Sequence, residues 1–272
     1  MGKAVRLDKF LADSGAGTRT EVKKFIQKGM VLVNGEKMKR PEIKVDPDKD
    51  IVLFGGEQLG KRAEFVYYLL NKPAGYVSAT EDNRENTVLE LIPKDRRRSL
   101  FPVGRLDKDT EGLLLITDDG QLAHQLLSPK KHVDKTYFAV TAGKVETEDI
   151  KKIKEGVDIG DEALTLPGKL EILKTWQRKA EDVHPELGDF WKEHEDLWDG
   201  WMSEILLTIH EGRFHQVKRM MEALGKKVIY LKRISMGSLT LPEELPKGQA
   251  RQLTEEELAA LQEQKPEFSR IG

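Results

Sequence analysis

With 272 residues, 38% of them hydrophobic, and a formal net charge of −2 at pH 7, the chain is long enough for one sizeable core plus a small additional domain. The absence of cysteine excludes disulfides and cysteine nucleophiles, and the six histidines show no spacing typical of metal ligands. No apolar run approaches the roughly 20 residues that cross a bilayer, and the N-terminus lacks an apolar signal core, so we expect a cytoplasmic protein.

The first domain is predicted to begin with two short helices. Apolar residues recur at helical spacing over residues 7–11 and again over residues 22–26. Thr18 and Glu21 form a capping box, which is a typical start for the second helix. The dipeptide Asn34–Gly35 between short apolar runs then predicts a β-hairpin, so this domain should combine two helices with a small sheet.

The first 44 residues carry a local surplus of positive charge, with eleven Lys and Arg residues against five Asp and Glu residues. A solvated helix face would account for some of these charges, and Glu21 and Lys24 have suitable spacing for it. A face of one sign on so small a module nevertheless favours contact with phosphate groups, which releases counterions. The candidate nucleic-acid contacts on this module are Arg6, Lys9, Arg19, Lys23 and Lys24.

A glycine-rich, polar run at residues 55–64 indicates a domain boundary. We assign residues 1–60 to the first domain, 61–64 to a linker and 65–272 to a second, larger domain. The second domain opens with a short apolar run that predicts a buried strand. This strand ends in the sequence Asn71–Gly75, which by itself predicts only a turn.

A polar turn at residues 104–112 directly precedes the apolar run 113–116, which is typical of a buried strand. Catalytic groups are frequent on such loops, and Asp107 beside the cation Arg105 is a candidate nucleophile or acid/base group. Two other interpretations compete. The acidic residues could simply bind nearby backbone, or they could form a calcium loop, although the twelfth position is Asp118 rather than glutamate.

Beyond this turn the sequence predicts helices and strands in alternation. The predicted elements are a short helix at 119–127, strands at 135–140, 203–209 and 226–234, and a terminal helix capped by Thr254 and Glu257. The strand at 203–209 is followed by a helix whose buried stripe should comprise Phe214, Val217, Met221 and Leu224.

Residues 176–201 contain all four tryptophans of the chain and a strong excess of acidic residues. Pro185 is a suitable first residue for an amphipathic helix within this insert. Because an acidic surface repels phosphate, we expect the insert to serve packing or protein contact rather than contact with nucleic acid.

The run GRLDKDTEGLLLITDDG at residues 104–120 resembles the signature of the RsuA-type ribosomal RNA pseudouridine synthases. Four further matches follow the family's order: NKPAG at 71–75, KTY at 135–137, EGRFHQVKRM at 211–220 and LPKGQARQLT at 245–254. The first domain, with RLDKFL and GMVLVNG, resembles an S4 RNA-binding domain. The resemblance covers nearly the whole chain apart from the insert at 176–201.

This resemblance implies an α+β fold, with a small S4 RNA-binding domain of αL type linked to a catalytic domain built on a mixed, mainly antiparallel sheet. It also implies the reaction, in which the N1–C1′ bond of a uridine breaks, the base turns, and C1′ joins C5. This isomerisation is redox-neutral and needs no cofactor. The segment GRFHQVKRM resembles the branch that acts on small-subunit ribosomal RNA.

Residue roles follow from the resemblance by position. Asp107 becomes the catalytic aspartate, Lys218 the cation that pairs with it, and Tyr137 the aromatic that stacks on the flipped target base. Arg105 would fill the gap left by that base or hold phosphate. Further candidate RNA contacts in the catalytic domain are Asn71, Lys72, Arg213, Gln216 and Arg219.

Several alternatives remain open at this level. Asp107 could add to the base, add to the sugar, or remove a proton at C2′. The substrate could be large-subunit RNA, and it could be free RNA or a partly assembled particle. A non-catalytic ribosome-assembly protein would also keep the S4 domain, but the joint presence of Asp107, Tyr137 and Lys218 argues against it. We expect the enzyme to act as a monomer.

Overall fold

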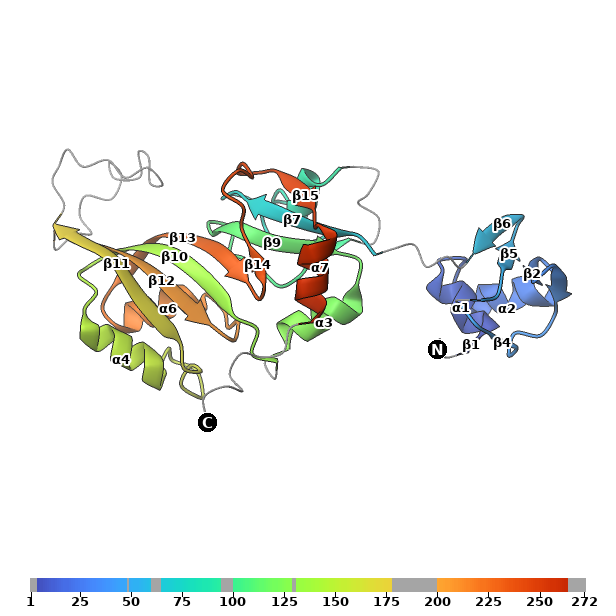
Figure 1. Ribbon diagram of the computed structural model, residues 1–272, viewed down its shortest axis with the longest axis horizontal. Coiled ribbons are helices and arrows are strands. Elements are labelled where there is room, and N and C mark those ends of the chain that lie inside the picture. The colour runs from blue at the N-terminus through green and yellow to red at the C-terminus, as the bar shows by residue number, and fades with distance from the viewer. Residues whose placement is uncertain are drawn as a thin grey trace. The chain divides into compact units, whose positions relative to one another are not determined.

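The computed structural model describes residues 4–47, 49–59, 65–93, 100–128, 131–177 and 200–263. The chain divides into two compact units, Met1–Phe65 and Val66–Gly272, each with its own hydrophobic core (Figure 1). Among the helices in these described ranges, none is both long and apolar enough to cross a membrane.

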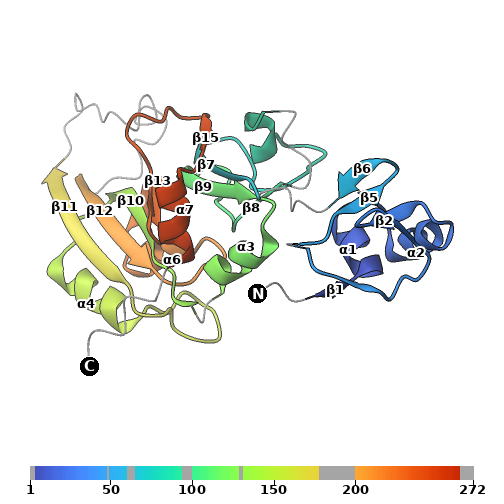
Figure 2. The same ribbon diagram turned by 45° about the vertical axis from the view of Figure 1, so that its right-hand side comes forward.

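The first unit packs two helices against short antiparallel strands (Figure 2). Its helices are α1 (Leu7–Asp13) and α2 (Arg19–Gln27), and its strands are β1 (Val5–Arg6), β2 (Val31–Val33), β3 (Glu36–Met38), β4 (Lys44–Val45), β5 (Val52–Phe54) and β6 (Glu57–Leu59). The strands pair as β1-β4 and as β3-β2-β5-β6. Apolar side chains of both helices and of β2, β4 and β5 form one buried core.

Local sequence signals explain most of this first unit. The capping box predicted for Thr18 and Glu21 is confirmed. The hairpin predicted at Asn34–Gly35 is confirmed too, and both residues adopt the left-handed conformation, with φ of 52° and 86°. The glycine-rich run at 55–64, which predicts a domain boundary, begins inside the first unit. Its first residues, Gly55 and Gly56, form the turn of a second hairpin between β5 and β6. The linker assigned to 61–64 lies outside the described residues.

The described part of the second unit is built on one large mixed sheet. Its strands are β7 (Tyr67–Lys72), β8 (Phe101–Pro102), β9 (Glu111–Thr117), β10 (Lys135–Ala142), β11 (Lys169–Gln177), β12 (Trp201–Ile209), β13 (Lys227–Met236), β14 (Leu239–Thr240) and β15 (Ala250–Gln252). The main order is β11-β12-β10-β13-β9-β7-β15, with β8 beside β9 and β14 beside β13. The helices of this unit are η1 (Val88–Leu91), α3 (Gly120–Leu127), α4 (Thr147–Glu155), α6 (Gln216–Ala223) and α7 (Glu255–Gln262).

The sheet consists of two halves that meet where β9 lies beside β13. Neighbouring strands on either side pair antiparallel, whereas β9 and β13 pair parallel. Their recorded register is short and consists of Lys232 with Glu111 and Arg233 with Gly112. The turn predicted at 104–112 therefore ends at this junction, and residues carried by the β10–β13 half can approach it.

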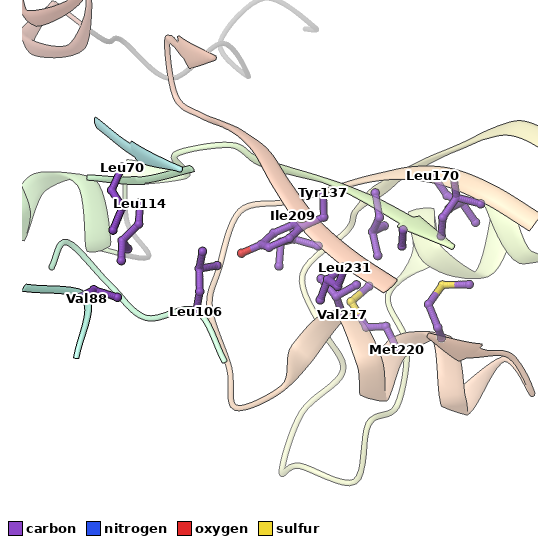
Figure 3. Close-up of a cluster of buried hydrophobic side chains, with 14 of the residues drawn as sticks. Leu70, Val88, Leu106, Leu114, Tyr137, Leu170, Ile209, Val217, Met220 and Leu231 are labelled. Carbon is purple, nitrogen blue, oxygen red and sulfur yellow. The ribbon is translucent and has the colours of Figure 1, made fainter. Parts of the chain in front are cut away.

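The principal core lies on the face of the sheet that α4 and α6 cover. Ile153 of α4 and Val217, Met220 and Met221 of α6 pack against apolar side chains of the strands. Figure 3 shows that the same cluster extends across both halves of the sheet, from Leu70 to Leu231. A smaller cluster around Met202 and Tyr230 forms a second core.

Gly112 offers a direct test of the junction between β9 and β13. Its φ is +100°, and a Cβ there would overlap the carbonyl oxygen of Arg233 and lie 2.9 Å from its nitrogen. We therefore expect Gly112→Ala to lower the free energy of unfolding by about 3 kcal/mol in a urea titration. Gly160→Ala is the matched control, because its φ is also positive but no atom lies within 4 Å of the added Cβ, so it should cost only about 1 kcal/mol. Equal effects of the two substitutions would contradict the proposed overlap.

Candidate active site

Backbone contacts hold the turn that carries Asp107 in one conformation. The backbone nitrogen of Thr110 donates to the carbonyl oxygen of Asp107 at 3.1 Å, which closes the turn. The hydroxyl of Ser78 accepts from the backbone nitrogen of Leu106 at 3.0 Å and donates to its carbonyl oxygen at 2.9 Å. Leu106 is itself buried in the core, and the Asp107 side chain is 27% exposed. The carboxylate is thus presented at the surface from a fixed backbone.

Lys72 lies beneath this turn and is fully buried. Its ammonium lies within hydrogen-bonding distance of four backbone oxygens, those of Thr110 (2.8 Å), Asp107 (3.0 Å), Pro73 (3.0 Å) and Lys108 (3.2 Å). Burial lowers the pKa of Lys72 to about 8, although nearby carboxylates partly oppose the shift. The direct RNA contact expected for Lys72 is therefore not supported, because its charge faces the protein and joins β7 to the turn.

Lys72 and Lys135 together predict a particular pH dependence of stability. Burial lowers the pKa of Lys135 to about 8 as well, and its Nζ donates to the oxygen of Val133 at 3.0 Å. Between pH 8 and 10 the unfolded chain therefore binds more protons at these two lysines than the folded protein does. As the pH rises through this range, each lysine should increase the free energy of unfolding by up to roughly 2 kcal/mol. Urea titrations should show that the free energy of unfolding increases from pH 8 to pH 10, and that this increase is smaller in Lys135→Met. An increase as large as that of the wild-type protein would contradict the lowered pKa of Lys135.

The start of α6 brings two side chains to Asp107. His215 is the N-cap of α6 and adopts a left-handed conformation with φ 48° and ψ 36°. Its Nε2 lies 3.4 Å from Asp107 Oδ1, and Lys218 Nζ lies 3.5 Å from Asp107 Oδ2. Lys218 is also 2.7 Å from both carboxylate oxygens of Asp109, whose side chain is 72% exposed. Lys218 is thus shared by two carboxylates of the same turn.

The other polar residues of this motif bind protein groups. Arg213 donates to Glu211 at 3.0 Å and to the backbone oxygens of Ala163 and Leu164 at 2.6 and 2.7 Å. Gln216 is 4% exposed, accepts from the backbone nitrogen of Arg213 and donates to Glu211, both at 2.9 Å. These contacts fix the segment before α6 against the loop around residues 161–165.

Arg219 forms a similar set of contacts. Its guanidinium donates to the backbone oxygens of Phe214, at 3.1 Å, and Ile159, and to Asp161 at 2.5 Å. The arginine beside Asp161 lowers the pKa of that carboxyl group. Asn71 is equally engaged, since it is 4% exposed and donates to the oxygen of Leu245 at 2.8 Å. Direct RNA contact by the buried side chains of Asn71 and Gln216 is not supported by this geometry.

Tyr137 and Arg105 complete the predicted set. Tyr137 belongs to β10, is 8% exposed, and its hydroxyl points towards Leu106 in Figure 3. It therefore lies on the same side of the sheet as the residue that precedes Asp107. Arg105 is exposed, and among the described residues its guanidinium has no hydrogen-bond or ion-pair partner. Unlike Arg213 and Arg219, it is available to a ligand.

The buried stripe predicted for the helix after β12 is partly wrong. Val217 and Met221 are buried, but Phe214 is 76% exposed. The helix begins only at Gln216, so the helical periodicity does not extend back to Phe214.

The first unit presents most of its predicted contacts to solvent. Lys9, Arg19, Lys23 and Lys24 are exposed. Arg6 forms two hydrogen bonds, of 2.9 and 3.0 Å, with the buried carboxylate of Asp8 and lowers the pKa of that group. Arg6 thus compensates a buried charge of its own domain, whereas Lys9, Arg19, Lys23 and Lys24 remain exposed at the surface.

The calcium interpretation of the turn finds no support from its own residues. Lys218 pairs with Asp109, and Glu111 accepts from the hydroxyl of Tyr230 and pairs with Lys247, both at 2.7 Å. Within the described ranges, no group of three or more His, Asp or Glu side chains is arranged to hold a metal ion.

Similarity to known proteins extends over nearly the whole chain. Residues 66–223 match the family described as RNA pseudouridylate synthase, and residues 5–51 match the S4 domain. An uncharacterised RNA pseudouridine synthase of Bacillus subtilis, YtzG, is 46% identical over 95% of this chain and 99% of its own. The ribosomal small subunit pseudouridine synthase A of Vibrio vulnificus is 38% identical over 93% and 98%. A crystal structure of a pseudouridylate synthase superposes with a TM-score of 0.61 at 36% identity, covering 94% and 99%.

Proposed function

Because the chain belongs to the RNA pseudouridylate synthase family and carries an S4 domain, we propose that it converts one uridine of small-subunit ribosomal RNA to pseudouridine, at the position numbered 516 in the family's target. The enzyme class follows from family membership. The small-subunit substrate is supported by near full-length similarity to proteins named for that activity. The exposed cations of the S4 domain provide contacts for the phosphate backbone.

The single observation that supports this function best is the surrounding of the Asp107 carboxylate. One of its oxygens faces His215 and the other faces Lys218, at 3.4 and 3.5 Å, and Lys72 holds the backbone beneath it. The carboxylate is thus oriented from two sides while remaining partly open to solvent. This arrangement suits a group that must react with a nucleotide brought from solution.

The reaction requires the target base to leave its stack, since the bond to be broken is otherwise inaccessible. The N1–C1′ bond breaks, the base turns, C1′ bonds to C5, the hydrogen of C5 leaves as a proton, and N1 gains a proton. Asp107 assists this exchange as a carboxylate, with Lys218 holding one of its oxygens. Tyr137 supplies the aromatic surface against the turning base.

We expect Lys218→Ala to lower kcat by roughly 100-fold with a smaller change in KM, because the carboxylate of Asp107 loses the cation that orients it. Single-turnover and steady-state rates would separate these effects. Lys108→Ala is the control, because Lys108 belongs to the same turn but pairs with Glu85 at 2.6 Å, away from Asp107. A wild-type kcat in Lys218→Ala would show that another group orients Asp107.

The decisive experiment uses ribosomal RNA transcripts that carry tritium at C5 of every uridine, because joining C1′ to C5 expels that hydrogen. We expect release of one equivalent from the small-subunit transcript and none from the large-subunit transcript. Mapping the new pseudouridine then identifies its position. Release from the large-subunit transcript alone would overturn the substrate assignment, and release from neither transcript nor from isolated ribosomal particles would overturn the activity.

A further inference from the structure

Phe214 is an aromatic residue whose side chain is largely exposed to solvent. An aromatic ring contributes most to stability when it is buried, yet 76% of Phe214 is open to solvent. Among the large hydrophobic residues that the structure describes as exposed, it has the greatest exposed fraction. It also lies in the segment that delivers His215 and Lys218 to Asp107. Its place in the loop beside a reactive group, together with this exposure, points to a role in binding rather than in folding.

The ring is held in place although it is exposed. It stacks on the imidazole of His215, with ring centroids 3.8 Å apart and an angle of 18° between the planes. The carbonyl oxygen of Phe214 accepts from Arg219 at 3.1 Å, and Arg219 is itself bound to Asp161. The left-handed conformation of His215 is strained for a residue with a side chain and is maintained by these contacts. The protein thus supports one face of the Phe214 ring and leaves the rest of it accessible.

The position of this ring relative to Asp107 limits what it can bind. The imidazole under Phe214 lies 3.4 Å from Asp107 Oδ1, so the exposed ring is separated from the reactive carboxylate by a single side chain. The sugar of the target uridine must approach that carboxylate, and its base has Tyr137 as a separate aromatic partner. A nucleotide that neighbours the target therefore lies within reach of Phe214. Unpaired bases stack readily on exposed aromatic rings, and every base has a face suited to this.

We propose that Phe214, supported by His215, is a stacking surface for an unpaired RNA base adjacent to the target uridine. The inference rests on the proposed function, because it requires RNA at Asp107. The two arginines nearest the ring in sequence, Arg213 and Arg219, bind protein groups, so stacking rather than a charge contact is the interaction that this segment offers. The surface recognises an unstacked, single-stranded neighbourhood of the target rather than a duplex.

The test compares three substitutions with the tritium-labelled small-subunit transcript. Phe214→Ala removes the ring, Phe214→Leu keeps apolar surface without a π-face, and Phe214→Trp keeps a π-face. We expect KM to rise about 10-fold in the alanine and leucine variants and to stay near the wild-type value in the tryptophan variant. Leu173→Ala is the matched control, because Leu173 is 46% exposed on β11 and its loss should change neither KM nor kcat.

A spectroscopic measurement separates stacking from a general loss of structure. A synthetic RNA fragment around the mapped uridine carries 2-aminopurine beside the target, and it is bound by Asp107→Asn protein so that no turnover occurs. Stacking on Phe214 should quench the fluorescence, and the additional change Phe214→Ala should abolish the quenching.

The outcomes distinguish the two proposals. Suppose the wild-type protein releases tritium. An unchanged KM in Phe214→Ala, or equal KM values in the leucine and tryptophan variants, would then overturn the stacking surface while leaving the enzyme activity established. Absence of release by the wild-type protein would overturn both.

Discussion

Asp107→Asn is expected to abolish tritium release from labelled RNA, with kcat falling by at least about 10⁴-fold. Asparagine has nearly the same shape but no negative charge, so it cannot act as a nucleophile or a base. The turn itself should persist, because Lys72 and Thr110 contact the backbone oxygen of residue 107 and not its carboxylate. The S4 cations are untouched, so RNA affinity measured by filter binding should remain within a few-fold of the wild-type value.

Asp109→Asn provides the matched control for this prediction. Asp109 lies two residues away in the same turn, is largely exposed, and also pairs with Lys218. In Asp109→Asn, Lys218 keeps its ion pair with Asp107 and loses only the pair with Asp109. We therefore expect only a modest change in kcat. If the two substitutions reduced kcat equally, the reactive carboxylate could not be assigned to Asp107, and substantial turnover by Asp107→Asn would contradict the assignment outright.

Lys72→Met should lower kcat by about 100-fold even though Lys72 touches no substrate. Methionine fills a similar volume but donates no hydrogen bond, so four backbone oxygens in and beside the Asp107 turn lose their common donor. The turn then relaxes, and a displacement of about 1 Å at a reacting group is enough for a loss of this size. Steady-state kinetics measure the effect, and circular dichroism shows whether the fold is retained.

Lys108→Met is the control for this buried lysine, because Lys108 is a half-exposed member of the same turn and binds Glu85. It should retain wild-type kcat. A folded Lys72→Met protein with wild-type kcat would show that the remaining contacts, such as those of Ser78 with Leu106, suffice to position Asp107.

The elements of the fold were largely predictable from local patterns. The helices of the first unit, the Asn34–Gly35 hairpin and the Thr254 capping box are confirmed because each depends on neighbouring residues. The order of the strands was not predictable. The parallel pairing of β9 with β13 joins segments more than a hundred residues apart, and no local signal encodes it.

The candidate site, too, could be predicted only in part. The sequence motif places Asp107 and Lys218, and the structure brings them within 3.5 Å. The sequence predicts an RNA contact for Lys72 because it reveals a charge but not its burial. No local pattern indicates the role of Ser78, because its partner, Leu106, is 28 positions away. The exposure of Phe214 has no sequence signal either, because the helix starts at a left-handed histidine, which is not a usual capping residue.

The antiparallel pair of β11 and β12 has one end near the segment that reaches Asp107 and the other end far from it. At one end, β12 finishes at Ile209 and leads into the segment that reaches Asp107. At the other end, Gln177 pairs with Trp201, and residues 178–199 connect them. The nine residues of β12 place these ends roughly 26 Å apart. A change at the Gln177–Trp201 end of this strand pair therefore reaches the reactive carboxylate only through the length of β12, whereas a change at Ile209 acts on the segment beside Asp107 directly.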